Sequence, residues 1–137
     1  MHDTPRRNPP CLLLPVLLLT GCTALPPSPC RSGETAAVVE TLYFGTATPD
    51  GRVSAADWQD FLAREVTPRF PQGLTVSAAE GQWRGADGRI VREATQVLTL
   101  VTAGSDAAAL QAIISAYRTR FRQEAVLHVR HAACLAG

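Results

Sequence analysis

The sequence contains no lysine, so all thirteen of its basic residues are arginines, and twelve acidic residues stand against them. Removal of residues 1–21 would take away Arg6, Arg7 and Asp3 and leave eleven residues of each sign. A neutral domain offers no electrostatic footprint for nucleic acid. The sequence also lacks a phosphate-binding loop, a C-x-x-C pair and a G-x-S-x-G nucleophile motif. These absences exclude the most recognisable nucleotide, redox and hydrolase sites.

A long hydrophobic run is missing as well. The apolar stretch 11–19 follows Arg6 and Arg7 and contains Pro15, whereas a membrane-spanning helix needs roughly 20 apolar residues. A basic start followed by a short apolar core is typical of a signal peptide. The adjacent arginines leave a twin-arginine signal open, but the prolines that follow them favour the general secretory route.

The signal ends in Leu19-Thr20-Gly21-Cys22, the layout of a bacterial lipoprotein. A small residue before the cysteine favours cleavage between Gly21 and Cys22 and attachment of acyl chains such as palmitate to Cys22. The alternative is an ordinary secretory signal beside a chance cysteine. Two or more acyl chains hold a protein stably on a membrane. We therefore expect a cell-envelope location, and Thr23 favours the outer membrane, facing the periplasm, if the host is Gram-negative.

The rest of the chain divides into two parts. Residues 22–36 form a proline-rich tether after the lipidated cysteine, and residues 37–137 form one domain. Cys11 leaves with the signal, so Cys30 and Cys134 remain as an even pair in an oxidising compartment. A Cys30–Cys134 disulfide is the natural expectation, with two separate thiols as the alternative.

Hydrophobic periodicity predicts the order β-α-β-β-α-β. Strands are expected at 38–46, 74–84, 89–102 and 125–131, and helices are expected after the N-caps Ser54 and Asp106. This order predicts a ferredoxin-like α+β fold with an antiparallel four-stranded sheet and two helices on one face. The first and last strands are neighbours in that fold, so Cys30 and Cys134 can meet.

Alternation along the strands assigns their faces. One set is expected to face the helices: Leu42, Phe44, Leu98, Leu100, Leu127 and Val129. The other set would face away: Thr41, Tyr43, Val97, Thr99, Val101, Val126, His128 and Arg130. An uncovered and partly apolar face is typical of an interface or a ligand groove. Packing as a homodimer, a small-molecule pocket and cover by the chain's own tail all remain open.

The histidines indicate no metal site. His128 and His131 are three residues apart on a strand, so they point to opposite faces and cannot converge on one ion. His128 near Tyr43 has two interpretations, a general base and a simple hydrogen-bond partner. No catalytic residue and no cofactor can be assigned, and whether the protein is an enzyme is undecided.

The segment Gly81-Gln82-Trp83-Arg84 places an aromatic ring beside an amide and a guanidinium. Such a group could bind a planar or anionic ligand. The alternative is that Trp83 packs into the core while Gln82 and Arg84 face the other way. Arg92 and Glu93 could form an exposed pair, which would contribute little to stability.

Several motifs in order resemble the DUF3574 family. They are 42–45 (LYFG), 58–62 (WQDFL), 65–70 (EVTPRF), 73–75 (GLT) and 81–84 (GQWR). The resemblance covers roughly residues 38–130. It implies a small exported bacterial domain, often with a lipoprotein signal, whose function is not established. The residues to test as a site or interface would be Tyr43, Arg69, Gln82, Trp83, Arg84 and Glu93, with His128 added from the strand pattern.

The sequence thus leads to two hypotheses. The first is a lipid-anchored envelope protein that binds a partner or itself through the open sheet face. The second is a small-molecule-binding protein or enzyme of the dimeric α+β barrel type. Its pocket would lie between sheet and helices and be lined by Tyr43, Gln82, Arg84 and His128.

Overall fold

The computed structural model describes residues 30–137. The expected signal peptide, the Gly21–Cys22 cleavage site, lipidation of Cys22 and the tether up to residue 29 lie outside the described residues. Within residues 30–137, none of the helices has the length and apolar character that crossing a bilayer requires.

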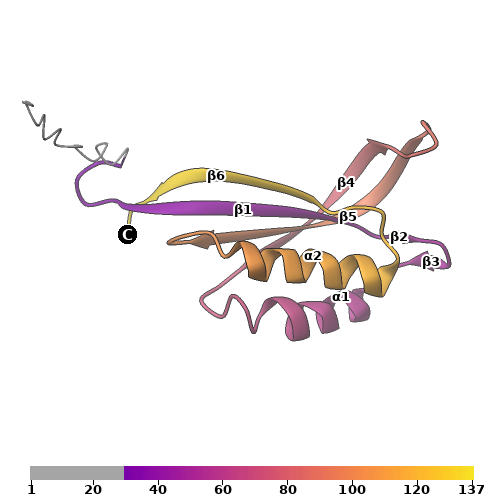
Figure 1. Ribbon diagram of the computed structural model, residues 1–137, viewed down its shortest axis with the longest axis horizontal. Helices are drawn as coiled ribbons and strands as arrows, with labels where there is room; N and C mark the ends of the chain where they lie inside the picture. The colour runs from indigo at the N-terminus through magenta and orange to yellow at the C-terminus, as the bar shows by residue number, and fades with distance from the viewer. Residues whose placement is uncertain (1–29) are drawn as a thin grey trace, which may run out of the picture.

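The described chain is a four-stranded sheet with a helical layer on one face (Figure 1). The strands are β1 (Thr35–Gly45), β4 (Thr75–Arg84), β5 (Ile90–Thr102) and β6 (Leu127–Leu135); β2 (Ala47–Thr48) and β3 (Gly51–Arg52) form a separate small hairpin. The helices are α1 (Ala55–Phe61), continued by the π-helical turn η1 (Leu62–Val66), and α2 (Ala107–Phe121). The sheet order is β4-β5-β1-β6, with antiparallel neighbours throughout. The predicted ferredoxin-like α+β fold is confirmed.

Both helices begin at the predicted N-caps. The side chain of Ser54 accepts a hydrogen bond from the backbone N–H of Asp57 at 3.1 Å. The carboxylate of Asp106 accepts one from the backbone N–H of Ala109 at 2.9 Å. Each bond satisfies a backbone donor that has no partner inside its helix. Local signals were therefore sufficient to place both helix starts.

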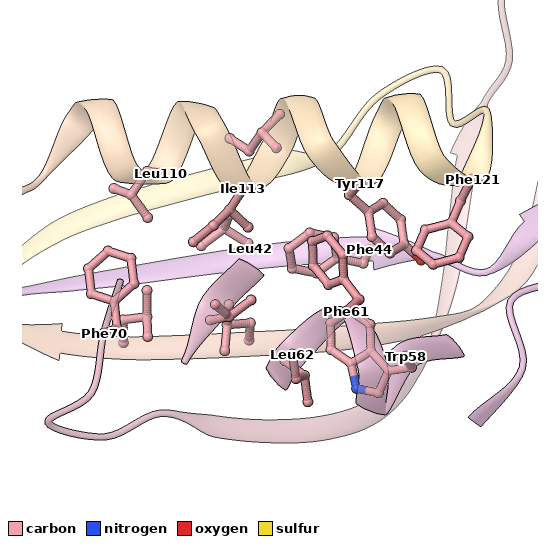
Figure 2. Close-up of a cluster of buried hydrophobic side chains, with 14 of the residues drawn as sticks. Leu42, Phe44, Trp58, Phe61, Leu62, Phe70, Leu110, Ile113, Tyr117 and Phe121 are labelled. Atoms are coloured by element: carbon pink, nitrogen blue, oxygen red, sulfur yellow. The ribbon is translucent and has the colours of Figure 1, made fainter. Parts of the chain in front are cut away.

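The core lies between the sheet and the helices and is rich in aromatic rings (Figure 2). Phe44 of β1 lies at its centre, with its ring centroid 4.6 Å from that of Tyr117 on α2 and 5.2 Å from that of Trp58 on α1. Phe61 and Phe121 extend the cluster. Rings inclined in this way gain interaction energy beyond the burial of their area. The core therefore fixes both helices against the same strand.

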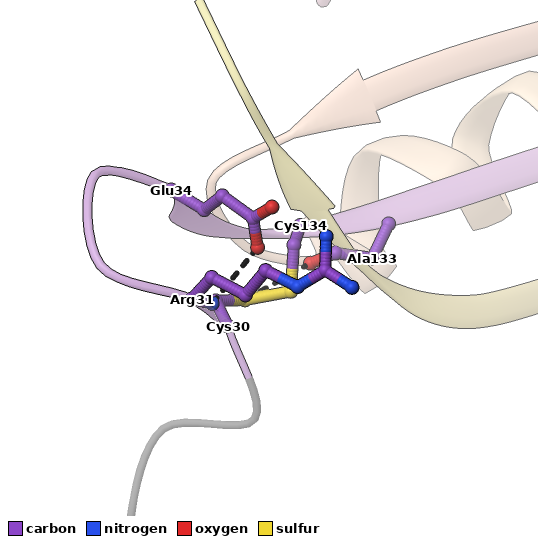
Figure 3. The surroundings of a disulfide bond; sticks show 5 residues. All are labelled: Cys30, Arg31, Glu34, Ala133 and Cys134. Carbon is purple, nitrogen blue, oxygen red and sulfur yellow. Dashed lines mark hydrogen bonds between the residues drawn. A yellow bond between two sulfur atoms is a disulfide. The ribbon is translucent and has the colours of Figure 1, made fainter.

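A disulfide joins Cys30 to Cys134 across 104 positions of sequence (Figure 3). Thr35 at the start of β1 lies opposite Leu135 at the end of β6, which brings the two cysteines to one end of the sheet. The backbone N–H of Arg31 donates to the Glu34 carboxylate at 2.9 Å and shapes the turn before β1. The disulfide therefore ties the start of the described chain to the end of β6.

The predicted faces are correct for β1 and β5 but wrong for β6. Leu42 lies opposite both Leu98 and His128, and residues directly opposite in a ladder share a face. His128 and Arg130 therefore lie on the helix side, whereas Leu127 and Val129 lie on the open side, 60% and 42% exposed. Val126 also packs against the core rather than facing away from it. The apolar residues of β6 are the exposed set because Glu40 of β1, fully buried, takes polar partners from this edge strand.

Candidate functional site

The open face of the sheet contains a cavity of about 470 Å³. It lies near the end of β1, where the β4–β5 hairpin bends away from the helical layer (Figure 1). Its walls come from three strands, β1, β4 and β5, together with the connection from α2 to β6 and the first residue of β6. The lining residues are Tyr43, Gly45, Ala79, Glu80, Gly81, Gln82, Trp83, Glu93, Thr95, Gln123, Glu124, Ala125 and Leu127.

Glu93 is the organising residue of this cavity. Its Oε1 accepts a hydrogen bond from the indole Nε1 of Trp83 at 2.8 Å. Its Oε2 accepts one from the backbone N–H of Ala47, also at 2.8 Å. Hydrogen bonds to a carboxylate are stronger than those between neutral groups. The Glu93 side chain on β5 thus fixes both the Trp83 ring on β4 and the start of β2 at Ala47.

Two glycines make room for this arrangement. A Cβ built on Gly45 would lie 2.5 Å from Oε1 of Glu93, so the carboxylate lies directly over the bare backbone of β1. A Cβ on Gly81 would lie 2.6 Å from the Thr95 hydroxyl. Glycine inside a strand often marks such a close approach. Both positions must stay without a side chain for the cavity floor to keep this shape.

The floor is also held from the helix side. The Tyr117 hydroxyl donates to the carbonyl of Gly45 at 2.9 Å. Burial, together with the negative charge of Glu93, raises the pKa of Tyr117 well above its ordinary value, so the phenol remains a donor. The amide of Gln123 donates to the carbonyl of Ala47. The segment after β1 is therefore held from both sides of the sheet.

The structure brings together four of the seven predicted site residues. Tyr43, Gln82, Trp83 and Glu93 line the cavity. Gln82 does so without its side chain facing Trp83, because it lies opposite Arg92 and points to the other face of the sheet. Tyr43 and Trp83 are each 37% exposed, so the interpretation of Trp83 as a core residue is wrong. Glu93 carries the Trp83 and Ala47 hydrogen bonds rather than standing as an exposed partner of Arg92.

The other three predicted residues lie elsewhere. Arg69 pairs with the Glu65 carboxylate at 3.0 Å and donates to its carbonyl. Arg84 donates to the carbonyl of Gly88 in the β4–β5 turn at 2.9 Å. His128 lies on the helix side of the sheet, beside Glu40. The expectation of a pocket between the sheet and the helices is therefore wrong, because the cavity lies on the opposite face of the sheet.

His128 belongs to a second polar cluster around Glu40. Its Nε2 lies 2.7 Å from Oε2 of Glu40, and the Nε of Arg130 lies 3.7 Å from Oε1. Burial alone would raise the pKa of Glu40, but hydrogen bonds from Ser105 and His128 and the charges of His128 and Arg130 outweigh it, and the pKa is lowered. The hydrogen-bonded interpretation of His128 is the one that this geometry supports.

One grouping of metal-ligating atoms occurs in the described part of the chain, formed by Cys30, Glu34 and Cys134. The two sulfurs are joined in the disulfide, so no thiolate is left to bind an ion. The histidines do not join this grouping, and His128 is engaged with Glu40. These residues give no metal centre.

Sequence reasoning missed Gly45, Thr95, Gln123 and Leu127 as lining residues. The glycines at 45 and 81 interrupt strand patterns, and that signal could have indicated a close approach of side chains to the backbone. Leu127 was assigned to the core because it is apolar. Gln123 follows the end of α2 and carries no periodic signal.

Comparisons with known proteins found one family model and several similar solved structures. The sequence model described as "Protein of unknown function (DUF3574)" matches residues 39–136. A phage SAM lyase in complex with S-methyl-5′-thioadenosine has a similar structure, with a TM-score of 0.58 and 15% identity over 82% of this chain and 97% of that one. CutA from Synechococcus elongatus PCC7942 is less similar, with a TM-score of 0.46 and 10% identity over 76% and 83%. No curated protein sequence matches the chain.

Proposed function

Because the chain belongs to the DUF3574 family, whose function is unknown, we propose a function from its own geometry: a small-molecule-binding protein of the bacterial cell envelope, anchored through lipid on Cys22. The observation that carries the proposal is the cavity of about 470 Å³ on the open sheet face. Ligand sites are commonly concave, of roughly 300–1,000 Å³, and mostly apolar with a few fixed polar groups. Tyr43, Trp83 and Leu127 supply the apolar walls, and Glu93 supplies the fixed polar group.

Preorganisation supports binding at this site. Glu93 holds Trp83 and the start of β2 at the same time, so the ring does not have to be ordered when a ligand arrives. Ordering a side chain on binding costs roughly 0.5–1.5 kcal/mol, which this arrangement avoids. The similar phage lyase was solved with a small molecule bound, which supports the idea that this fold can hold one.

Native mass spectrometry of the full chain, exported to an oxidising compartment and purified gently, tests the proposal. We expect a fraction of the chain to carry additional small-molecule mass. Trp83→Ala should remove this mass, because the ring is a wall of the cavity. Ile90→Ala is the matched control, since Ile90 is also exposed on the β4–β5 hairpin but outside the cavity lining. An unadorned wild-type chain would contradict the proposal.

A second function, self-association as a homodimer, is favoured by the same face away from the cavity. Val101, Val129 and Leu135 are exposed there, on β5 and β6. Contiguous exposed apolar groups are typical of contact surfaces. Sedimentation equilibrium should show dimers that Val129→Glu abolishes, whereas Gln111→Glu on the exposed side of α2 should leave them intact. A wild-type chain that stays monomeric at high concentration would contradict this second function.

A further inference from the structure

The charge of the cavity on the open sheet face is one-sided. Its lining includes the carboxylate of Glu93 and the exposed residue Glu124, and among the described residues it contains no arginine or histidine. Glu80 also lines it, but Glu80 lies opposite Ala94 in the ladder, so its side chain points to the other face of the sheet from Glu93. This contrasts with the chain as a whole, in which acidic and basic residues nearly balance. A concave site with walls of low polarity focuses the field of its charges. The cavity is therefore complementary to a cation.

The aromatic walls favour the same ligand. Tyr43 and Trp83 both line the cavity with part of their surface exposed. The face of an aromatic ring attracts a cation, and tryptophan does so most strongly. The same faces and the Leu127 side chain also accept an apolar or aromatic body. A small inorganic cation would leave these walls unused, so an organic cation fits the chemistry better.

The position of Glu93 also favours a ligand with an ammonium group. Each of its oxygens accepts one hydrogen bond from the protein, at 2.8 Å, and a carboxylate oxygen has a second lone pair to offer. The donors Trp83 Nε1 and Ala47 N hold the carboxylate in place without neutralising its charge. A ligand ammonium group can therefore be oriented by a fixed anion.

We propose, resting on the binding function above, that the cavity takes a small organic cation with an aromatic or apolar body. The positive group lies toward Glu93 and Glu124, and the body lies against Tyr43, Trp83 and Leu127. Charge complementarity selects this occupant over an anionic metabolite. The same complementarity favours the organic cation over a neutral apolar molecule of equal size.

Three probes with one phenyl ring and different charge test this assignment: phenethylammonium, 2-phenylethanol and 3-phenylpropionate. The full chain carries two tryptophans, whose indole N–H signals are read by nuclear magnetic resonance. Trp83 reports on the cavity, and Trp58, buried in the core, is the internal control. We expect phenethylammonium to shift the Trp83 signal with an affinity about tenfold or more above that of 2-phenylethanol, and 3-phenylpropionate to bind most weakly.

A matched pair of variants isolates the charge. Glu124→Gln removes an exposed carboxylate of the cavity lining and leaves the Glu93 hydrogen bonds in place. It should reduce the preference for the cation several-fold while 2-phenylethanol binds as before. Glu65→Gln removes the same formal charge outside the cavity, and it should leave the preference unchanged.

The outcomes separate this inference from the proposed function. Equal binding of all three probes, or preference for the anion, would overturn the cation assignment and leave a small-molecule site standing. No shift of the Trp83 signal by any probe would overturn both. A Trp83 signal that moves with protein concentration alone would assign the cavity to a second copy of the chain, and the cation assignment would fail.

Discussion

The two faces of this sheet hold one buried or partly buried carboxylate each, in opposite circumstances. Glu40, on the helix side, is fully buried and surrounded by His128, Arg130 and Ser105. Glu93, on the open side, is held by neutral donors at the edge of a cavity. The first charge is neutralised inside the protein, and the second is positioned but not neutralised. The comparison shows how one sheet can pack a core on one face and present a cavity with an uncompensated carboxylate on the other.

The neighbours Phe44 and Tyr43 give the largest expected contrast, because they point to opposite faces of β1. Phe44→Ala should lower the free energy of unfolding by about 3–5 kcal/mol, since it removes the centre of the aromatic core. Tyr43→Ala, at a half-exposed ring, should cost about 1 kcal/mol or less and should weaken probe binding in the cavity. Urea unfolding followed by circular dichroism measures both. Equal costs would mean that the open face is as tightly packed as the core.

Glu40→Gln tests the closed face. The folded-state pKa of Glu40 lies below its ordinary value of 4.5. The unfolded chain therefore takes up the proton first as pH falls, and the stability from the carboxylate is present above about pH 4.5 and is lost below it. We expect the variant to cost about 2 kcal/mol at neutral pH, because it leaves His128 and Arg130 without their anion.

The same variant should show a flatter loss of stability between pH 5 and pH 3 than the wild type, measured by urea unfolding across a pH series. Glu65→Gln is the control, because its ion pair with Arg69 is partly exposed. Parallel acid profiles of wild type and Glu40→Gln would show that the cluster around Glu40 does not couple folding to protons.

The difference between the faces also explains what the sequence could predict. The helix caps, the apolar stripe of α2 and the strand order are local or periodic, and they were placed from the sequence. The sequence does not show which face each β6 side chain occupies, because Leu127 and Val129 alternate with His128 and Arg130. Only the partner strand decides which set is covered. A fully buried Glu40 overrode the ordinary preference for apolar residues inside.

The candidate site was half predicted for a similar reason. Trp83, Gln82 and Glu93 were noted from their chemistry. That Glu93 would lie over Gly45 is a contact between residues 48 positions apart, and no local pattern encodes it. The register of β1 against β5 and the bend of the hairpin are needed to see it.

Gly45→Ala tests the open face with a single methyl group. The new Cβ would displace the Glu93 carboxylate and break its bonds to Trp83 and Ala47. We expect a cost of about 1–2 kcal/mol, since two partly exposed donors lose a charged acceptor. The Trp83 indole N–H signal should also move, while that of Trp58 stays. An unchanged Trp83 signal would mean that Glu93 does not hold the ring.

Tyr117→Phe gives the smallest expected effect apart from Tyr43→Ala and tests whether the two faces communicate through the backbone of Gly45. The variant removes one hydrogen bond to the Gly45 carbonyl and should cost about 1 kcal/mol at neutral pH. The raised pKa of Tyr117 means that the unfolded chain loses the phenolic proton first as pH rises, so this stability is complete below about pH 10 and is lost above it. Urea unfolding at pH 8 and pH 11 should therefore show a steeper alkaline loss of stability for wild type than for Tyr117→Phe.

The Trp83 indole N–H signal of the same variant tests the coupling between the two faces. If removing the Tyr117 hydroxyl on the helix side shifts this signal, the Gly45 carbonyl couples the packing of the core to the cavity floor. If the signal stays, Glu93 holds the Trp83 ring independently of the Tyr117 hydrogen bond.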